Sequence, residues 1–383
     1  MMSSHPPLEL ASRCRARRGV ALVMAVVAMA VLGVLVAGVF FTALREQRDG
    51  HDAVHRVQAL ASAEYGLAAT LSPETWRPEW NGSTRRGLLY LNAFDPAPDA
   101  ADTVRIWKLE QGSFLLVSTG VAGPASSPAF RRIGLLVALR IPWLGARAAV
   151  IARDGAWVGD SSRISGIDTV PPHWSCPPED VDRPAVIVPA VTSVSGGECT
   201  AKPCLVGAPP VSADVAAAGP EMYERFGTRD RDSIAAFGVQ LAGDAAILAP
   251  APALDRAGEC DVTRPDVLGD PLRLLGEESP CADHFPLIHA PGNMRIEGGT
   301  GEGLLIVDGD LTIAGGAYFS GVAAVRGVLE ITGASALHGT ALASRVMVRG
   351  GSLARYSSCA VERALRAAAL PVVPEGMAWS EMY

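Results

Sequence analysis

The sequence predicts a two-part chain: an α+β N-terminal module with a long transmembrane helix and a small antiparallel β meander, then a mainly-β parallel β-helix or solenoid. Three observations lead to this prediction. Residues 19–44 form a run of 26 residues without a charge. Three strand patterns lie within residues 103–141. The C-terminal third aligns with itself at a period of 18 residues, which is the expected length of one rung.

These patterns divide the chain into successive segments. They are a basic leader (1–19), a transmembrane and amphipathic helix (20–72), a small meander (73–147), a solenoid (148–360) with a Cys-rich insertion at about 169–290, and a C-terminal cap and tail (361–383). After the leader the chain carries 29 Lys and Arg against 39 Asp and Glu, and no basic cluster follows the apolar run. This charge balance argues against nucleic acid as a partner.

The apolar run is long enough to cross a membrane. As a helix it spans roughly 39 Å, against about 30 Å for the hydrocarbon core of a bilayer. Arg13, Arg15, Arg17 and Arg18 all precede it, whereas the segment after it has mixed charge. The positive-inside rule therefore predicts a single-pass membrane protein with a cytoplasmic N-terminus and its bulk on the other side of the membrane. A cleaved secretory signal is the alternative, but its apolar core spans only about 7–15 residues.

The same helix is expected to continue beyond the membrane, because no proline interrupts it before Pro73. Apolar residues recur at helical spacing in this second half and predict a stripe that packs on a sheet. The residues of this expected stripe are Val54, Val57, Leu60, Ala61, Leu67, Ala68 and Leu71. The prediction is one helix of roughly fifty residues, half in lipid and half packed.

The meander is predicted from three short segments with β-branched and aromatic residues. They are "TVRIWKL" (103–109), "SFLLVSTGV" (113–121) and "RRIGLLVALRI" (131–141). Gln111-Gly112 marks a tight turn between the first two. The resulting sheet is expected to bury the outer half of the helix.

The repeats lie near the C-terminus. Residues 304–321 and 322–339 align without gaps, a third copy starts at Thr340 with a one-residue slip, and a weaker copy covers 150–166. Glycines recur at the same places and are expected at corners, while stacked rungs supply the core. The expected inner residues are Leu305, Val307, Leu311, Ile313, Val325, Leu329, Ile331, Leu342, Val346 and Val348. An amphipathic helix at 357–370 is expected to close the stack.

The N-terminal segment carries a family resemblance. "RRGVALVMAVVAMAVLG", "REQR" and "ALASAEYGLAA" follow one another within residues 13–72. This stretch resembles the N-terminus of PilX-type minor pilins and of the related tip pseudopilins of type II secretion. The resemblance implies that a prepilin peptidase cuts after Gly19, that Val20 becomes the methylated N-terminus, and that the apolar half-helix packs among other pilin-like subunits. It also implies that the membrane is a bacterial inner membrane and that the bulk of the chain is periplasmic or extracellular. Met24 stands where major pilins carry a glutamate, which argues against a major subunit.

The C-terminal pattern is similar to the β-solenoid ectodomains that some envelope proteins carry behind a PilX-like N-terminus. The expected function is therefore that of a minor pilin-like protein. It would take part in assembly, priming or tip display of a type IV pilus or pseudopilus. The solenoid would be its interaction module outside the cytoplasm, for a surface or polysaccharide ligand. A single-pass scaffold that never enters a filament is a further alternative.

Six cysteines follow the apolar run: Cys176, Cys199, Cys204, Cys260, Cys281 and Cys359. In an oxidising compartment they fit three disulfides, for which 15 pairings exist. The local candidates are Cys199 with Cys204 and Cys260 with Cys281. A zinc site is the alternative, because His173 and Cys176, like Cys281 and His284, have metal-ligand spacing. We expect disulfides, no metal and no cofactor.

Catalytic motifs are scarce. The sequence has no GxSxG elbow, and "GGTGEG" (298–303) lacks the spacing of a nucleotide-binding loop. Asp308, Asp310 and Glu330 could form an acidic groove for Ca²⁺ or for sugar hydrolysis. A membrane-tethered carbohydrate-active enzyme, or a polysaccharide-binding protein that uses this groove, is thus the alternative function. We expect these carboxylates to be solvated turn residues and the chain to be no enzyme, with no catalytic residues.

Overall fold

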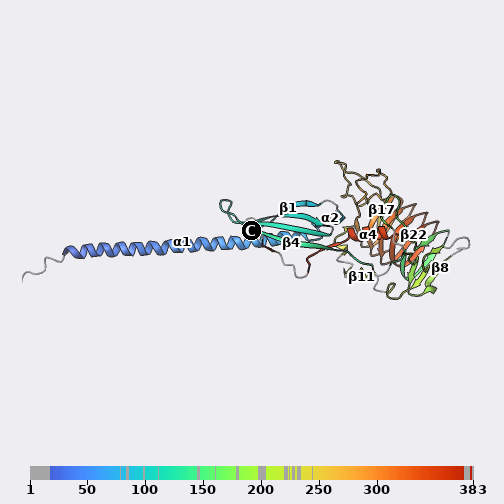
Figure 1. Cartoon of the computed structure of the whole chain (residues 1–383), viewed down its shortest axis with the longest axis horizontal. Coiled ribbons are helices and arrows are strands. Elements are labelled where there is room, and N and C mark those ends of the chain that lie inside the picture. Colours follow the sequence, from blue (N-terminus) through green and yellow to red (C-terminus); the bar gives the residue numbers. More distant parts are fainter. Residues whose placement is uncertain are drawn as a thin grey trace, which may run out of the picture.

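The computed structural model shows a long helical rod that leads into a small antiparallel sheet and then into a larger β body (Figure 1). It describes residues 18–381 apart from short gaps, which are 78, 83–85, 98–99, 111, 145–146, 160, 178–180, 197–203, 220–222, 224, 227–228, 231–233, 244 and 375–379.

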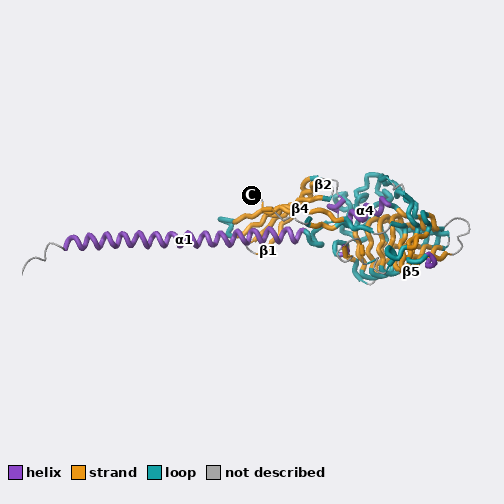
Figure 2. Tube along the Cα trace, turned by 60° about the horizontal axis from the view of Figure 1, so that its bottom comes forward, coloured by secondary structure: helices purple, strands orange, loops and turns teal. Residues whose placement is uncertain are grey.

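Helix α1 (Arg18–Thr70) contains 53 residues and matches the single long helix predicted from the sequence. It ends just before Pro73, which cannot continue a helix. In its last turn, the Thr70 hydroxyl donates a hydrogen bond to the Gly66 carbonyl oxygen at 2.7 Å. The first half of α1 projects away from the β units, whereas its second half lies along the antiparallel sheet (Figure 2).

The antiparallel sheet has the strand order β1-β2-β3-β4-β23, and β24 also pairs with β4. Three of its strands lie where the sequence predicted them. No strand was expected at β1, β23 or β24. In β3, buried and half-buried residues alternate strictly, because one face of this strand packs on α1. The strands and the short helix beside them are β1 (Gly87–Ala97), β2 (Ala100–Glu110), β3 (Ser113–Ala122), β4 (Ala129–Arg140), β23 (Leu370–Val372), β24 (Ser380–Glu381) and α2 (Glu79–Gly82).

The second unit is a curled, mostly parallel sheet of 16 strands among the described residues (Figure 1). Both faces of several strands are buried, so all ten expected inner residues lie in the core together with their neighbours. The strands are β5 (Val150–Val158), β6 (Arg163–Ser165), β7 (Val186–Val188), β8 (Val194–Gly196), β9 (Leu205–Val206), β10 (Val211–Ala213), β13 (Val239–Gln240), β14 (Ala245–Leu248), β15 (Leu287–Ala290), β16 (Asn293–Glu297), β17 (Thr300–Val307), β18 (Leu311–Ala314), β19 (Tyr318–Val325), β20 (Val328–Ile331), β21 (Ala336–Val348) and β22 (Leu353–Tyr356).

Two minor elements complete the list. They are the 3-10 helix η1 (Val191–Ser193) and a separate hairpin of β11 (Arg225–Phe226) and β12 (Arg229–Asp230).

The register of the parallel strands follows the sequence alignment. Ile313 pairs with Ile331, and Gly321 pairs with Gly303 on one side and with Gly339 on the other. Gly321 has a φ of +140°, and an added Cβ would lie 2.0 Å from the Gly303 carbonyl oxygen. Only glycine fits this position, where neighbouring strands turn at the same corner.

The spatial order of the strands differs from their order in the sequence. β5, from the weak N-terminal copy, pairs directly with β21 near the C-terminus, and β7 and β10 continue outward from β5. The chain then crosses to the opposite side, where β13, β15 and β17 lead back to β21. The segment expected as an insertion, 169–290, therefore supplies strands on both sides of the central repeats.

Helix α4 (Ser358–Ala367) begins where the Ser357 side chain accepts a hydrogen bond from the Ala360 N–H. The sequence predicted that this helix closes the end of the stack, but it does not. Instead it packs across β17, β19 and β21, on the side of the curled sheet. The chain then returns to the antiparallel unit through β23 and β24, so the predicted cap and tail tie the two units together.

Candidate functional site

The N-terminal half of α1 is an apolar surface that is not buried against any other part of the chain that the structure describes. Among the helices that the structure describes, α1 is the one that is long and apolar enough to cross a membrane. Its mean hydropathy reaches 3.0 over a window of 18 residues, and none of these residues is buried. Large side chains such as Val20, Phe40 and Phe41 are about two-thirds exposed. So large an exposed apolar surface marks a membrane or protein contact.

The C-terminal half of α1 packs on the antiparallel sheet through small residues. Its buried stripe consists of Ala59, Ser62, Ala63, Gly66, Leu67 and Thr70, which recur at three- and four-residue spacing. The stripe expected from the sequence was wrong at four of its seven positions, since Val54, Val57, Ala61 and Ala68 are exposed, whereas Leu67 is buried and Leu60 and Leu71 are half-buried. Small residues face the sheet because the helix backbone approaches it closely.

This close approach explains a glycine of the "AEYGL" stretch. An added Cβ on Gly66 would lie 2.4–2.5 Å from the carboxylate atoms of Asp102 on β2. Asp102 is only 1% exposed and lies directly against the helix. One turn earlier, the Ser62 hydroxyl donates to the Ala101 carbonyl oxygen at 3.0 Å. These contacts fix the angle at which the apolar half of α1 leaves the β unit.

The residues expected at the processing site lie at the start of this helix. Gly19 and Val20 belong to its first turn, and the Val20 side chain is 66% exposed. Of the four arginines of the leader, Arg13, Arg15 and Arg17 lie outside the described residues.

The cysteines form disulfides in the structure. Cys260 pairs with Cys281, as expected, with 4.9 Å between their Cα atoms. Cys176 pairs with Cys359 on α4, over a separation of 183 residues. Cys204 is also disulfide-bonded, and Cys199 lies outside the described residues.

The alternative zinc site does not form, because the two cysteines that it needs, Cys176 and Cys281, belong to different disulfides. Its histidines have other contacts as well. His173 Nδ1 lies 3.3 Å from the Glu277 carboxylate. The described residues contain no group of three or more metal-ligating side chains.

The acidic residues of the alternative enzyme hypothesis are each engaged by the protein. Asp308 and Asp310 lie in the turn between β17 and β18, not on one strand. Asp308 accepts hydrogen bonds from the Tyr223 hydroxyl at 3.1 Å and contacts His289 Nε2 at 2.9 Å. The Asp310 carboxylate accepts from the Val328 N–H at 2.7 Å. Glu330 forms an ion pair with Arg349.

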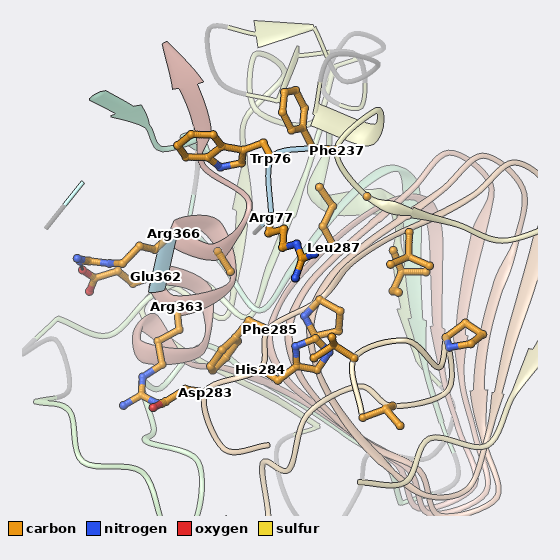
Figure 3. Close-up of a pocket in the computed structure, with 18 of the residues that line it drawn as sticks. Trp76, Arg77, Phe237, Asp283, His284, Phe285, Leu287, Glu362, Arg363 and Arg366 are labelled. Carbon is orange, nitrogen blue, oxygen red and sulfur yellow. Dashed lines mark hydrogen bonds and ion pairs between the residues drawn. The ribbon is translucent and has the colours of Figure 1, made fainter. Parts of the chain in front are cut away.

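A cavity of about 910 Å³ lies where the loop after α1, the loop before β15 and helix α4 meet (Figure 3). Trp76 and Phe237 lie on one side of it, and Phe285 lies on the other. Arg77 extends between them, in the direction of His284 (Figure 3). The sequence did not predict this cavity, because its walls come from segments far apart in the chain.

A buried latch holds the two β units together beside this cavity. The Asn81 side-chain amide donates to the carbonyl oxygens of Ala367, the last residue of α4, and of Ala369, both at 2.8 Å, and it accepts from Trp76 Nε1 at 3.1 Å. The Lys108 ammonium donates to the Asn81 carbonyl oxygen at 3.2 Å. Burial lowers the pKa of Lys108, and the charge of Arg366 adds to this effect. Asn81 begins an Asn-Gly-Ser sequon, but it is only 2% exposed and serves the fold.

Replacing Asn81 with alanine is expected to destabilise the chain by about 2–4 kcal/mol, because two buried carbonyl groups lose their donor. Urea unfolding of the full-length protein in lipid nanodiscs, followed by tryptophan fluorescence, measures this loss. Asn92→Ala, at a half-buried position of β1, is the matched control and should change the midpoint little. Equal midpoints for Asn81→Ala and the wild type would show that the latch does not join the units.

A column of buried polar side chains lies under α4. Glu302, Ser320, His338 and Arg355 pair one after the other in the strand register. The first three are 1%, 0% and 7% exposed, and Glu302 Oε2, Ser320 Oγ and His338 Nδ1 have no hydrogen-bond partner among the described residues. Sequence reasoning missed these residues, although Glu302, Ser320 and His338 follow the same 18-residue period as the glycines.

No protein-family model matches this chain, and no curated protein matches it. Among solved structures, the competence-associated pilin ComZ from Thermus thermophilus is 12% identical with a TM-score of 0.22, covering 86% of this chain and 98% of its own. An ice binding protein from an Antarctic Biological Consortium is 13% identical with a TM-score of 0.25, covering 57% of this chain and 91% of its own. Both scores are too low to establish a shared fold, so the function is argued from the residues of the chain itself.

Proposed function

We propose that this chain is a minor pilin-like subunit that takes part in assembly, priming or tip display of a type IV pilus or pseudopilus. The observation that carries the proposal is the division of α1 into two halves. Its first half exposes uncharged apolar residues on all sides, whereas its second half is fixed on a β sheet. Such a rod is stable only in lipid or among other apolar helices.

The membrane part of the proposal rests on length and charge. Residues 20–44 anchor the chain in a bacterial inner membrane, and the arginines before them hold the N-terminus in the cytoplasm. The β units then lie in the periplasm or beyond it. Disulfides such as Cys176–Cys359 are consistent with that oxidising compartment.

The proposal that the chain enters a filament rests on a move of the apolar helix from one apolar environment, the lipid, to another, a bundle of helices. When the exposed half of α1 moves from lipid into a bundle of helices from neighbouring pilin-like subunits, its apolar surface stays out of water. Prepilin peptidase cuts after Gly19, and Val20 becomes the methylated N-terminus. Because Met24 offers no carboxylate to a neighbouring N-terminus, we assign the chain to a low-copy position rather than to the body of the filament.

The curled parallel sheet is the interaction module of this proposal. Strand partners offset by 17 or 18 residues support its description as a β-solenoid. It is carried outside the cytoplasm for contact with a surface or polysaccharide ligand. We assign no catalysis to it. Asp308 contacts Tyr223 and His289, Asp310 accepts from the Val328 N–H, and Glu330 pairs with Arg349, so each of the three carboxylates has a contact within the fold.

The processing step tests the proposal. When the full chain is co-expressed with a prepilin peptidase, mass spectrometry should find a mature protein that begins at methylated Val20. Gly19→Ala should remain full-length, because the peptidase requires glycine before the cut. Gly33→Ala is the matched control, since nothing lies within 4 Å of a Cβ at this apolar position of α1, and it should be processed normally.

Two results would contradict the proposal. One is normal processing of Gly19→Ala. The other is a wild-type chain that stays uncut beside a peptidase that cleaves a control pilin in the same cells.

A further inference from the structure

The cavity beside α4 contains one positive charge that the described residues do not compensate. Arg77 is exposed and forms no ion pair with any residue that the structure describes, and its guanidinium lies 5.5 Å from the centre of the Tyr90 ring. Figure 3 shows its side chain extending into the cavity, between Trp76 and His284. A guanidinium so placed offers several hydrogen-bond donors in a fixed plane to an incoming anion.

The other arginines of the cavity have partners. Arg366 pairs with Glu362 at 2.6 Å, and Arg264 pairs with Asp266 at 2.5 Å. Arg363 lies 4.8 Å from the centre of the Trp174 ring, and its contact with an Asp283 oxygen measures 3.8 Å. The local balance therefore leaves close to one positive charge, centred on Arg77.

The remaining walls are largely apolar. Trp76, Phe285 and Leu287 are buried residues that line the cavity, and Phe237 packs against the cores of both β units. A volume of about 910 Å³ lies in the range of small-molecule sites, which occur preferentially between structural units. Aromatic walls around a single charged group are typical of sites for partly apolar ligands.

The cavity is also held in shape without a ligand. The Asn81 hydrogen bonds join the Trp76 loop to the chain segment after α4. The disulfide of Cys176 and Cys359, both in the cavity wall, fixes the start of α4. A preformed site loses less conformational entropy when it binds a small molecule.

From this geometry we propose that the cavity is a binding site for a small carboxylate with an aromatic or other apolar body. The carboxylate pairs with the Arg77 guanidinium, and the apolar body lies among Trp76, Phe237 and Phe285. This assignment is independent of the pilin-like function, because no residue of the apolar half of α1 takes part in it.

The test measures binding of 1-naphthaleneacetate to the full-length chain in phosphatidylcholine nanodiscs by equilibrium dialysis, with empty nanodiscs as background. Its uncharged amide, 1-naphthaleneacetamide, has nearly the same shape. We expect saturable one-to-one binding of the acid and a Kd for the amide that is at least ~10-fold weaker. Arg77→Gln should weaken binding of the acid by ~10-fold and leave binding of the amide unchanged.

Arg264→Gln is the matched control. It removes a guanidinium from the same cavity, but one that Asp266 already pairs, so the Kd for the acid should change by less than ~3-fold. The proposal is overturned if the wild type does not bind the acid more tightly than the amide. It is also overturned if Arg77→Gln, with an unchanged urea midpoint, binds the acid as the wild type does.

Discussion

Replacing Gly120 with alanine is expected to release the second half of α1 from the antiparallel sheet. Gly120 lies on β3 under the helix, where an added Cβ would be 2.0 Å from the Ala59 carbonyl oxygen and 2.6 Å from the Ala63 N atom. Both atoms belong to the helix backbone and cannot rotate away. The helix must therefore move, and the expected cost is about 3 kcal/mol.

The loss affects more than the site of the change. When α1 shifts, Ala59, Ala63 and Leu67 lose their contact with the sheet, and the rod is no longer held at a fixed angle. Hydrogen exchange of the full-length chain in nanodiscs measures this directly. We expect faster exchange of the amides of residues 55–70 in Gly120→Ala, together with a lower urea midpoint.

Gly50→Ala provides the matched control for this prediction. The same substitution at this exposed position of α1 meets nothing within 4 Å, so it should stabilise the helix by up to about 1 kcal/mol. The two substitutions should thus have opposite signs. If the amides of residues 55–70 exchange in Gly120→Ala as they do in the wild type, the helix does not pack on β3 as described.

His338 is expected to lower the folding stability as the pH falls from 7 to 4.5. Burial, together with the positive charge of the nearby Arg355, lowers the pKa of His338 to about 4. In the unfolded chain the same group has a pKa of about 6.5. Between these values the unfolded state binds more protons than the folded state, so acid favours unfolding by about 2 kcal/mol over this range.

The neighbouring Glu302 acts in the opposite direction. Burial raises its pKa well above the usual value, which Arg273 and Arg363 only partly offset, so the folded state takes up the proton at a higher pH than the unfolded state. This uptake stabilises the fold as the pH falls through that raised pKa. The change measured in the wild type is therefore the sum of the destabilising His338 effect and the stabilising Glu302 effect.

Two variants separate these contributions in urea titrations at pH 7 and pH 4.5. His338→Gln should lose less stability on acidification than the wild type, and Glu302→Gln should lose more. His51→Gln, at an exposed position of α1, is the control and should follow the wild type. The same loss in the wild type and in His338→Gln would remove His338 as the cause.

Much of the fold could be predicted from local patterns in the sequence. The uncharged run and the absence of proline before Pro73 predicted α1 correctly, because helix formation depends on neighbouring residues. Three strands of the antiparallel sheet contain β-branched and aromatic residues and lie where expected. The 18-residue alignment also matched the strand register around Gly321, because parallel partners at a corner need the same residue type.

The candidate sites were less predictable, because they depend on contacts between distant segments. The stripe of α1 that packs on the sheet consists mainly of small residues. Small residues are needed there because the helix lies close to Gly120 and Asp102, which are on separate strands. The pairing of Cys176 with Cys359 joins segments 183 residues apart. No local pattern distinguishes such a pairing from the alternatives.

The sequence by itself determined that the chain has an apolar membrane-length helix, a meander and a repeated parallel strand unit. Each of these follows from the periodicity or charge of adjacent residues. Only the tertiary structure decided that β5 pairs with β21, that α4 covers the side of the curled sheet, and that Arg77 extends into a cavity beside it. The reason is physical. These features arise where segments far apart in the chain pack together and exclude water, and this kind of burial produces no repeating pattern among neighbouring residues of the sequence.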